Sequence, residues 1–269
     1  MLETINRTIS YISQKSKSKP EIGIILGTGL AGLAKEIEIE TILDYADIPN
    51  FPISTVEGHH GKLIFGNLGG KKVIAMQGRF HYYEGYNMQQ VTFPVRVMKF
   101  LGVKKLFVSN ASGGINPDFQ IGDLMIITDH INLLPNPLIG KHYDEFGPRF
   151  PDMSKTYDSV LIEKALKIAK SNNIKVQKGC YVGVTGPTLE TPKEYEYFRV
   201  IGGDTVGMST VPEVIVARQM EIECFAISII TDLGVPGKIK KVELEEILKV
   251  AEKSEPKMTL IMKKLIEEI

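Results

Sequence analysis

The densest group of polar side chains lies in residues 78–85, which read GRFHYYEG and follow an apolar run. If an extended backbone continues through this segment, Arg79, His81 and Tyr83 point to one face, because side chains alternate along a strand. Arg and His together can hold an oxyanion, and the neighbouring Tyr ring can lie against a sugar. The alternative is a solvated strand end that binds nothing.

Three further polar side chains stand where apolar runs end and helices or turns are expected to begin. Ser209 lies beside an expected helix start, which is a natural site for an anion. Glu190 directly precedes an expected N-cap and can accept hydrogen bonds from the N–H groups of a heterocycle. Burial of Asp232 at a strand end would favour its neutral form, which can donate a proton to a ring nitrogen. The alternatives are helix-dipole stabilisation by Glu190 and an ordinary loop position for Asp232.

Two glycine-containing segments are consistent with more than one function. Residues 27–32, GTGLAG, fit the G-x-G-x-x-G pattern of dinucleotide-binding folds, with Asp47 as the ribose acceptor. The same segment fits a tight strand-to-helix turn, or a phosphate site made from backbone N–H groups and the Thr28 hydroxyl. Residues 109–114, SNASGG, fit equally a turn and a place where a ligand reaches the backbone.

Hydrophobic periodicity places these segments on alternating strands and helices. Two matches to the T-x-x-E capping box, at residues 191–194 and 210–213, predict helix starts. The Gly69-Gly70 dipeptide predicts a hairpin. Helices are expected over residues 2–15, 88–101, 161–170, 242–253 and 256–269, and strands over 22–26, 62–68, 72–77, 105–110, 124–128, 180–184, 205–208 and 224–231.

This order of elements predicts a single α/β domain over residues 1–269. Apolar strands that alternate with helices indicate a central mixed, largely parallel β-sheet flanked by helices on both faces. Residues 132–154 are rich in Pro, Gly and polar side chains and show little periodicity. A loop of that length inside a compact domain is typically functional.

The composition excludes several classes of protein. Lys plus Arg and Asp plus Glu both number 32, so no net positive charge attracts nucleic acid. Two cysteines, Cys180 and Cys224, are too few for a disulfide scaffold and indicate a reducing compartment. The sequence shows no signal peptide, no apolar run of about 18 residues and no metal-ligand spacing of Cys and His. We therefore expect a cytoplasmic protein with no membrane, metal or nucleic-acid partner.

These segments, in this order, resemble the trimeric class of purine nucleoside phosphorylases. The resemblance extends from Gly27 to Arg218 and displaces the dinucleotide interpretation of residues 27–32. It implies reversible phosphorolysis, in which a purine (2'-deoxy)ribonucleoside and inorganic phosphate give the free base and the sugar 1-phosphate. Phosphate is then a co-substrate, and no cofactor is implied. The matching blocks are GTGL, FPISTVEGHHGKL, QGRFHYYEGY, TFPVRV, SNASGGINP, GPRFPDMS, GPTLETPKE and VGMSTVPEVIVAR.

The resemblance also implies roles for individual residues. Three are implied in catalysis: His81, Glu190 and Asp232. A phosphate site is implied for Thr28, His59, Arg79, His81, Ser209 and the backbone N–H of Ala111. Contacts with the nucleoside are implied for Tyr83, Phe150, Tyr181, Leu189, Glu190, Val206, Met208 and Asp232. Among these, Phe150 lies in the long loop that reaches the neighbouring subunit's site in this family, which implies a homotrimer with shared sites.

Three positions depart from the family pattern. Asp232 stands where the family usually has an Asn that contacts purine N7 and the 6-oxo group, and similar enzymes that cleave adenosine or 5'-methylthioadenosine use Asp there. Leu244 stands in place of the usual His near the 5'-hydroxyl, and Leu189 in place of the usual aromatic residue. A 5'-methylthioadenosine or adenosine phosphorylase, or a catalytically weakened nucleoside-binding protein, are the alternatives to a purine nucleoside phosphorylase.

Overall fold

A computed structural model describes residues 1–27, 31–53 and 61–269 of the chain. Thr28 and His59, two of the expected phosphate ligands, lie outside the described residues. The helices are α1 (Leu2–Lys15), α2 (Gly32–Lys35), α3 (Met88–Phe100), α4 (Ser159–Ser171), α5 (Pro192–Val200), α6 (Val211–Gln219) and α7 (Leu244–Glu267). The strands are β1 (Ile22–Leu26), β2 (Glu38–Asp44), β3 (Lys62–Leu68), β4 (Lys71–Gln77), β5 (Lys105–Gly114), β6 (Leu124–Asn132), β7 (Val176–Gly183), β8 (Thr205–Gly207) and β9 (Glu223–Leu233).

The strands form one mixed sheet in the order β2-β3-β4-β1-β5-β8-β7-β6-β9, and β9 also pairs with β5. This last pairing closes β5, β8, β7, β6 and β9 into a ring. Parallel pairs join β1 to β4 and β5, β9 to β5, and β7 to β6 and β8, whereas β2, β3 and β4 form an antiparallel meander. The expected α/β class with a mixed, largely parallel sheet is confirmed.

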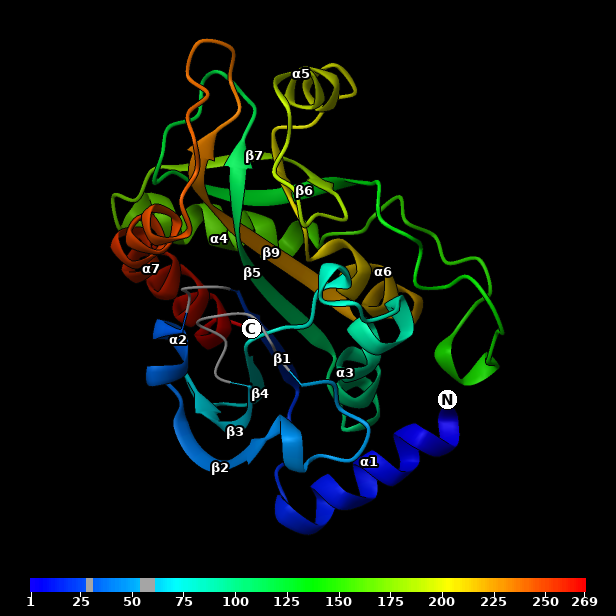
Figure 1. Ribbon diagram of the computed structural model, residues 1–269. Coiled ribbons are helices and arrows are strands. Elements are labelled where there is room, and N and C mark those ends of the chain that lie inside the picture. Colours follow the sequence, from blue (N-terminus) through cyan, green and yellow to red (C-terminus); the bar gives the residue numbers. More distant parts are fainter. Residues whose placement is uncertain (28–30, 54–60) are drawn as a thin grey trace.

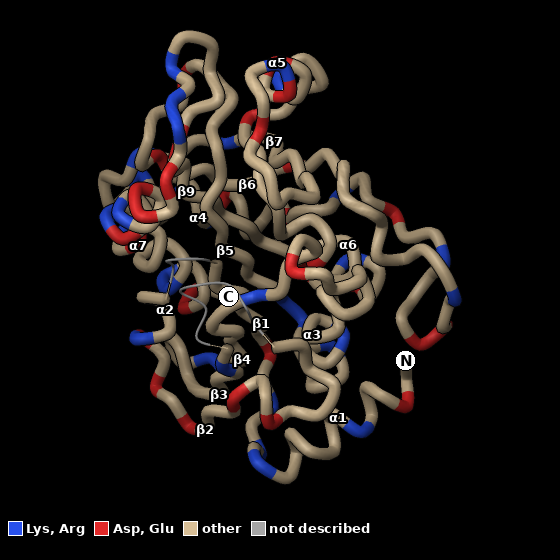
Figure 2. The backbone as a smooth tube through the Cα atoms, in the orientation of Figure 1, with Lys and Arg blue, Asp and Glu red and all other residues tan. Residues whose placement is uncertain are grey.

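The helices lie in two groups on opposite sides of the strands (Figure 1). Helix α3 contacts α1 and α6 on one side, and α7 contacts α2 and α4 on the other. Helix α5 lies apart from both groups, beyond the ends of β6 and β7. Acidic and basic residues alternate along the trace and do not gather by sign on one side of it (Figure 2). Among the described residues, no helix is both long and apolar enough to cross a membrane.

Strand β5 runs further than the sequence indicates, because its glycines let neighbouring strands approach. The SNASGG segment forms no turn but continues β5 to Gly114. A Cβ on Gly114 would lie 2.8 Å from a methyl group of Ile230, and a Cβ on Gly113 would lie 3.0 Å from Oδ2 of Asp232. Small residues there are therefore required by the pairing of β5 with β8 and β9.

The C-terminal prediction of two helices is wrong, because α7 continues through Pro256. Proline removes one backbone hydrogen bond from a helix interior, which is why the sequence suggests a break. The buried residues of α7 keep their helical spacing on both sides of the proline and pack on the core. They are Ala251, Ser254, Met258, Ile261, Met262, Leu265 and Ile266. Packing of this apolar stripe outweighs the lost hydrogen bond.

Candidate active site

A buried arginine forms the centre of the expected anion site. Arg79 follows β4 and is 1% exposed. Its Nη1 donates hydrogen bonds to the backbone oxygen of Ser109 (2.9 Å) and to Oγ of Ser209 (3.1 Å). Its Nε donates to Oε1 of Glu213 at 3.0 Å. The structure thus brings together the expected phosphate residues Arg79 and Ser209 beside Ser109 of β5.

Glu213 does not form the capping box expected from residues 210–213. Its side chain is 4% exposed and forms an ion pair with Arg79, so it is not available to cap α6. Thr210 does not cap the helix either, because its φ of 68° directs the backbone into the left-handed region. The Thr210 hydroxyl instead accepts a hydrogen bond from Nδ2 of Asn110 at 2.8 Å. The capping prediction is wrong here, although the box at Thr191 and Glu194 is confirmed.

The strained backbone at Thr210 is held by a series of buried, hydrogen-bonded polar side chains. A positive φ is rare for a β-branched residue and persists only where surrounding contacts fix it. Asn110 binds Thr210 through its amide nitrogen and accepts from Oγ of Ser228 (2.6 Å) through its amide oxygen. Ser228 in turn contacts Oγ of Ser112 at 2.6 Å. By holding Thr210, these hydrogen-bonded side chains orient the adjacent Ser209 toward Arg79.

His81 is held by Glu84, a residue that the sequence analysis did not identify. Strand β4 ends at Gln77, so the expected continuous extended face is wrong. A short 3-10 turn (Tyr82–Glu84) follows instead, and within it Oε1 of Glu84 lies 3.0 Å from Nδ1 of His81. The rings of His81 and Tyr83 stack at 4.7 Å. The turn therefore brings His81 and Tyr83 together by a different geometry from the one expected.

Burial sets the protonation of these rings. It lowers the pKa of His81 despite the opposing effect of the Glu84 hydrogen bond, and the charge of Arg79 lowers this pKa further. Burial also raises the pKa of Tyr83 to about 12. At neutral pH, His81 is therefore a neutral imidazole and Tyr83 a neutral phenol.

Tyr181 supports the segment that carries Met208 and Ser209. It lies on β7 and is fully buried, and its hydroxyl accepts a hydrogen bond from the Ser209 N–H at 3.3 Å. A Cβ on Gly207 would collide with this hydroxyl, and one on Gly186 would collide with the sulfur of Met208. These two glycines permit close packing of the side chains expected near the ribose.

Glu190 and Asp232 form a second group, at the opposite end of the site. Burial raises the pKa of both carboxyls, and the charge of Asp232 raises that of Glu190 further. The Thr231 hydroxyl donates to Oδ1 of Asp232 at 3.0 Å. An interaction with the Tyr195 side chain lowers the pKa of Glu190 and so partly opposes the effect of burial. Tyr195 is a further residue that the sequence analysis missed.

Strand β5 fixes the separation of these two groups. Its residue Ser109 contacts Arg79, and its residue Gly113 pairs with Val206 of β8 and with Asp232 of β9. Ser109 and Gly113 are four residue steps apart along the strand, which corresponds to about 13 Å. Ala111 lies on β5 between the two ends, where its N–H is expected to meet phosphate.

The remaining expected residues differ in exposure. Val206 is 2% exposed and packs in a small core with Tyr195 and Phe198. Leu189 and Leu244 are about half exposed. Phe150 is 87% exposed, in the long loop between β6 and α4.

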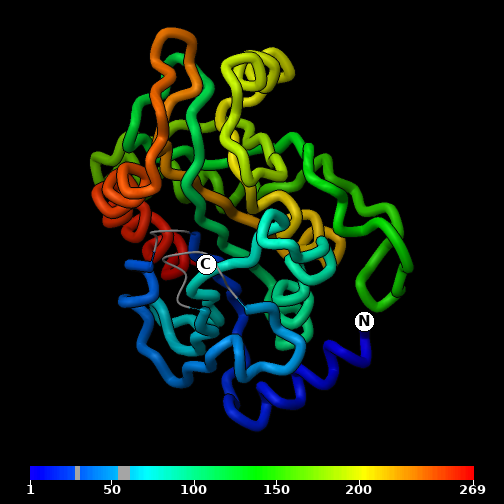
Figure 3. Tube along the Cα trace, viewed as in Figure 1, coloured from blue at the N-terminus to red at the C-terminus, as the bar shows by residue number. Residues whose placement is uncertain are grey.

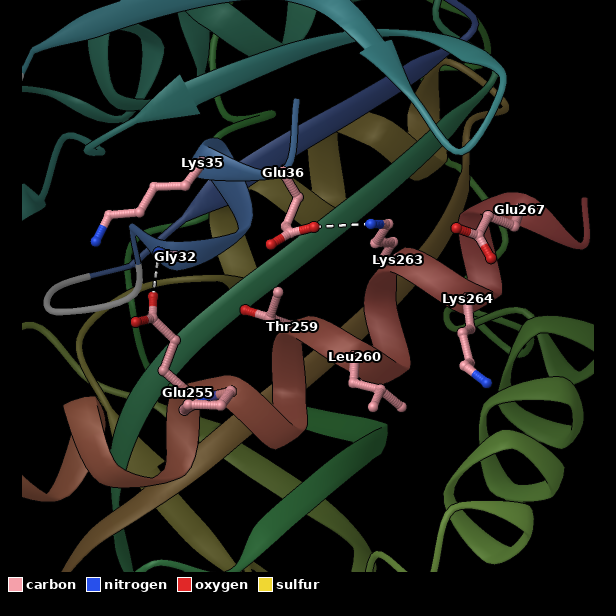
Figure 4. Close-up of a pocket in the computed structure, with 10 residues that line it drawn as sticks. Gly32, Lys35, Glu36, Glu255, Thr259, Leu260, Lys263, Lys264 and Glu267 are labelled. Atoms are coloured by element: carbon pink, nitrogen blue, oxygen red, sulfur yellow. Dashed lines mark hydrogen bonds and ion pairs between the residues drawn. The ribbon is translucent and has the colours of Figure 1, made fainter. Parts of the chain in front are cut away.

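A cavity of about 550 Å³ lies between α2 and α7 (Figure 4). Neither the Arg79–Ser209 group nor the Glu190–Asp232 group lines it. Its walls carry three lysines and three glutamates, so it has no excess charge: Lys35, Lys263, Lys264, Glu36, Glu255 and Glu267. Within it, Glu255 accepts a hydrogen bond from the N–H of Gly32, and Lys263 pairs with Glu36 at 2.7 Å. These contacts attach α2 to α7.

Comparison with known proteins gives consistent matches over the chain. Residues 21–267 match the family described as the phosphorylase superfamily. Purine nucleoside phosphorylase 1 of Bacillus subtilis is 52% identical, over 99% of this chain and 98% of that protein. Isoform 2 of the Schistosoma mansoni purine nucleoside phosphorylase, solved with cytosine and ribose-1-phosphate, has a TM-score of 0.94 at 44% identity (99% and 96% covered). A second Schistosoma mansoni structure, in complex with adenosine, has a TM-score of 0.95 at 42% identity (99% and 97% covered).

Proposed function

The chain belongs to the phosphorylase superfamily, and we propose that its site performs the reversible phosphorolysis of purine nucleosides. The observation that carries this proposal is the placement of a buried Arg79–Ser209 group and of Asp232 at two points along β5. A spacing of about 13 Å along that strand leaves room for a sugar between an anion and a purine base. No metal or organic cofactor enters the proposed reaction.

The proposed chemistry is displacement at the anomeric carbon of the ribose. An oxygen of phosphate forms a bond to C1', while the electron pair of the C–N bond leaves with the purine. Arg79 and Ser209 hold the phosphate in position, which replaces a bimolecular encounter by an oriented one. Neutral His81 adds no positive charge that would weaken the nucleophile. In their protonated forms, which burial favours, Glu190 and Asp232 donate hydrogen bonds that stabilise the negative charge developing on the base.

A cleavage assay tests the proposed function directly. Purified protein is incubated with inosine, guanosine, adenosine or 5'-methylthioadenosine, with and without inorganic phosphate. We expect release of free base only when phosphate is present. A nucleoside-binding protein without catalysis would bind the nucleosides and release no base, and this outcome would refute the proposal.

We propose that 6-aminopurines are better substrates here than in relatives with Asn at this position. Adenine presents an acceptor at N1 and a donor at its 6-amino group. Burial raises the pKa values of Glu190 and Asp232, which favours their protonated forms, and a protonated carboxyl can donate to N1 while its carbonyl oxygen accepts from the 6-amino group. The apolar Leu244 extends the proposal to substrates with an apolar 5' group, such as 5'-methylthioadenosine.

Asp232→Asn is expected to shift the preference from adenosine toward inosine. An amide donates to a 6-oxo group, whereas it cannot supply the proton that the carboxyl holds. The ratio of kcat/KM for inosine to that for adenosine should rise about 10–100-fold. Steady-state kinetics on both nucleosides measure the ratio, and Asp118→Asn, an exposed substitution away from the site, is the control. An unchanged ratio would contradict the role of Asp232.

We further propose that the protein is a cytoplasmic homotrimer in which Phe150 completes the neighbouring subunit's site. Nη1 of Arg149 donates to the backbone oxygens of Leu138 (3.2 Å) and Gly140 (2.9 Å), which holds the loop in shape and leaves Phe150 exposed. Ile139, 69% exposed, lines a surface pocket together with Phe150. Apolar side chains exposed together on a braced loop are typical of a protein–protein contact.

Phe150→Ser is expected to raise the nucleoside KM about tenfold, because a buried Phe contributes about 1.5–3 kcal/mol. The phosphate KM should change little. Kinetics and analytical ultracentrifugation measure the two properties, and Val200→Ser, at an 84% exposed apolar position, is the matched control. A fully active monomer would contradict the shared site.

A further inference from the structure

Five polar side chains form one continuous series of hydrogen bonds that ends at the anion site. Its members, in order, are Ser112, Ser228, Asn110, Thr210 and Ser209. The first four are at most 4% exposed, and Ser209 is half-buried. Strands β5 and β9 pair with Asn110 opposite Ser228, and in Figure 3 the two strands lie side by side in the middle of the trace.

The amide of Asn110 gives this series a direction. Its Nδ2 donates to Oγ1 of Thr210 at 2.8 Å, and its Oδ1 accepts from Oγ of Ser228 at 2.6 Å. A serine hydroxyl has one hydrogen, and Ser228 uses it on Asn110. The 2.6 Å contact between Ser112 and Ser228 is therefore a hydrogen bond that Ser112 donates. Every donor from Ser112 to Asn110 thus points toward the anion site.

Thr210 extends the same direction to Ser209. Its oxygen accepts from Asn110, and because the residue is 0% exposed, its own hydrogen needs an acceptor inside the protein. Among the hydrogen bonds of the described residues, the other partner of this hydroxyl is Oγ of Ser209, at 3.3 Å. Ser209 then accepts from Thr210 and, at 3.1 Å, from Nη1 of Arg79. Both lone pairs of Ser209 are occupied in this way, and its one hydrogen remains for a further acceptor.

From this order of donors we infer that Asn110 and Thr210 are positioning residues that present Ser209 to the anion as a hydrogen-bond donor. The inference rests on the proposed phosphorolysis and deepens it, since neither residue need touch phosphate. Each donor polarises the next hydroxyl, which strengthens the last hydrogen bond of the series. As a donor only, Ser209 binds an unprotonated oxygen of phosphate and cannot accept from a P–OH group.

Thr210→Val removes the hydroxyl and keeps the β-branched shape, whereas Thr210→Ser keeps the hydroxyl. We expect the Kd of inorganic phosphate, measured by isothermal titration calorimetry, to rise about tenfold in Thr210→Val, the size of a lost hydrogen bond. Thr210→Ser should bind phosphate as the wild type does, and the nucleoside KM should change little in either variant. Thr92→Val is the matched control, because Thr92 is also 0% exposed but donates to the oxygen of Met88 within α3.

Ser228→Ala interrupts the series on β9, where no hydrogen bond of the described residues joins Ser228 to Thr210 or Ser209 directly. Its effect on phosphate must therefore pass through Asn110. We expect the phosphate Kd to rise about threefold, toward the lower end of the contribution of one hydrogen bond. Ser254→Ala is the control, since it removes a 5% exposed hydroxyl that donates to the oxygen of Gly122 and should leave the phosphate Kd unchanged.

Wild-type phosphate affinity in Ser228→Ala or in a folded Thr210→Val would overturn the inference, as would a Thr210→Ser variant that binds as weakly as Thr210→Val. Calorimetry needs no turnover, so it separates this result from the proposed function. A wild type that binds phosphate but releases no base refutes the proposed function alone. A wild type that releases base, with variants of unchanged phosphate affinity, refutes only the roles of Asn110 and Thr210.

Discussion

Glu190→Ala is expected to lower kcat by about 10²–10⁴-fold, which is the usual contribution of a positioned acid or base. The carboxyl of Glu190 is the group that the site places, with Asp232, to interact with the departing purine. Its pKa is raised by burial, so it exchanges a proton closer to neutral pH than an exposed Glu does. Stopped-flow or steady-state phosphorolysis of adenosine and inosine measures the loss.

The control for this prediction is Glu196→Ala, because Glu196 lies on α5 but its side chain is 44% exposed and pairs with Lys193. This variant should keep wild-type kcat. A folded Glu190→Ala protein with near-normal turnover would remove Glu190 from the reaction.

Glu213→Gln is expected to lower the free energy of unfolding by about 3–5 kcal/mol, because it removes a buried carboxylate that is paired with the Arg79 guanidinium. Arg79 and Glu213 are 2% and 4% exposed at their side chains, so water does not screen the pair. Urea denaturation in a phosphate-free buffer measures the loss. Phosphate bound beside Arg79 would supply negative charge, so added phosphate should stabilise the variant more than the wild type.

The surface pair of Arg7 and Glu3 provides the control. Both side chains are more than 70% exposed, so Glu3→Gln should change the free energy of unfolding by less than about 1 kcal/mol. If Glu213→Gln is as stable as Glu3→Gln, the buried pair does not have the electrostatic importance that we assign to it.

The sequence allows much of the fold to be predicted where local pattern and burial agree. The amphipathic helix over Leu2–Lys15 and the apolar strand Ile22–Leu26 have the observed bounds. Strand β2 was missed because most of its side chains are exposed and show no apolar alternation. The break expected near Pro256 fails because packing against the rest of the chain decides that helix.

Some residues of the candidate site could also be predicted from local sequence, and others could not. A polar cluster after an apolar run identified Arg79, and an expected helix start identified Ser209; the structure brings these two residues together. Their roles, and those of the other expected ligands, remain predictions. Glu213 and Tyr195 could not be found, because local sequence does not specify a partner 134 residues away or a ring that packs on a distant glycine. A His-x-x-Glu spacing was the one available signal for Glu84.

The closure of β5 into a ring of strands has a consequence for how substrate range can evolve. Both ends of the site depend on β5, which is hydrogen-bonded to neighbouring strands along both of its edges. The length of β5 is therefore constrained. Helix α5 and the segment after β9 lie outside that ring and are joined to it by few contacts. Of the two carboxyls assigned to the base, Glu190 precedes α5 outside the ring, whereas Asp232 lies on β9 within it. A change of heterocycle preference through Glu190 therefore leaves the strands of the ring unaltered.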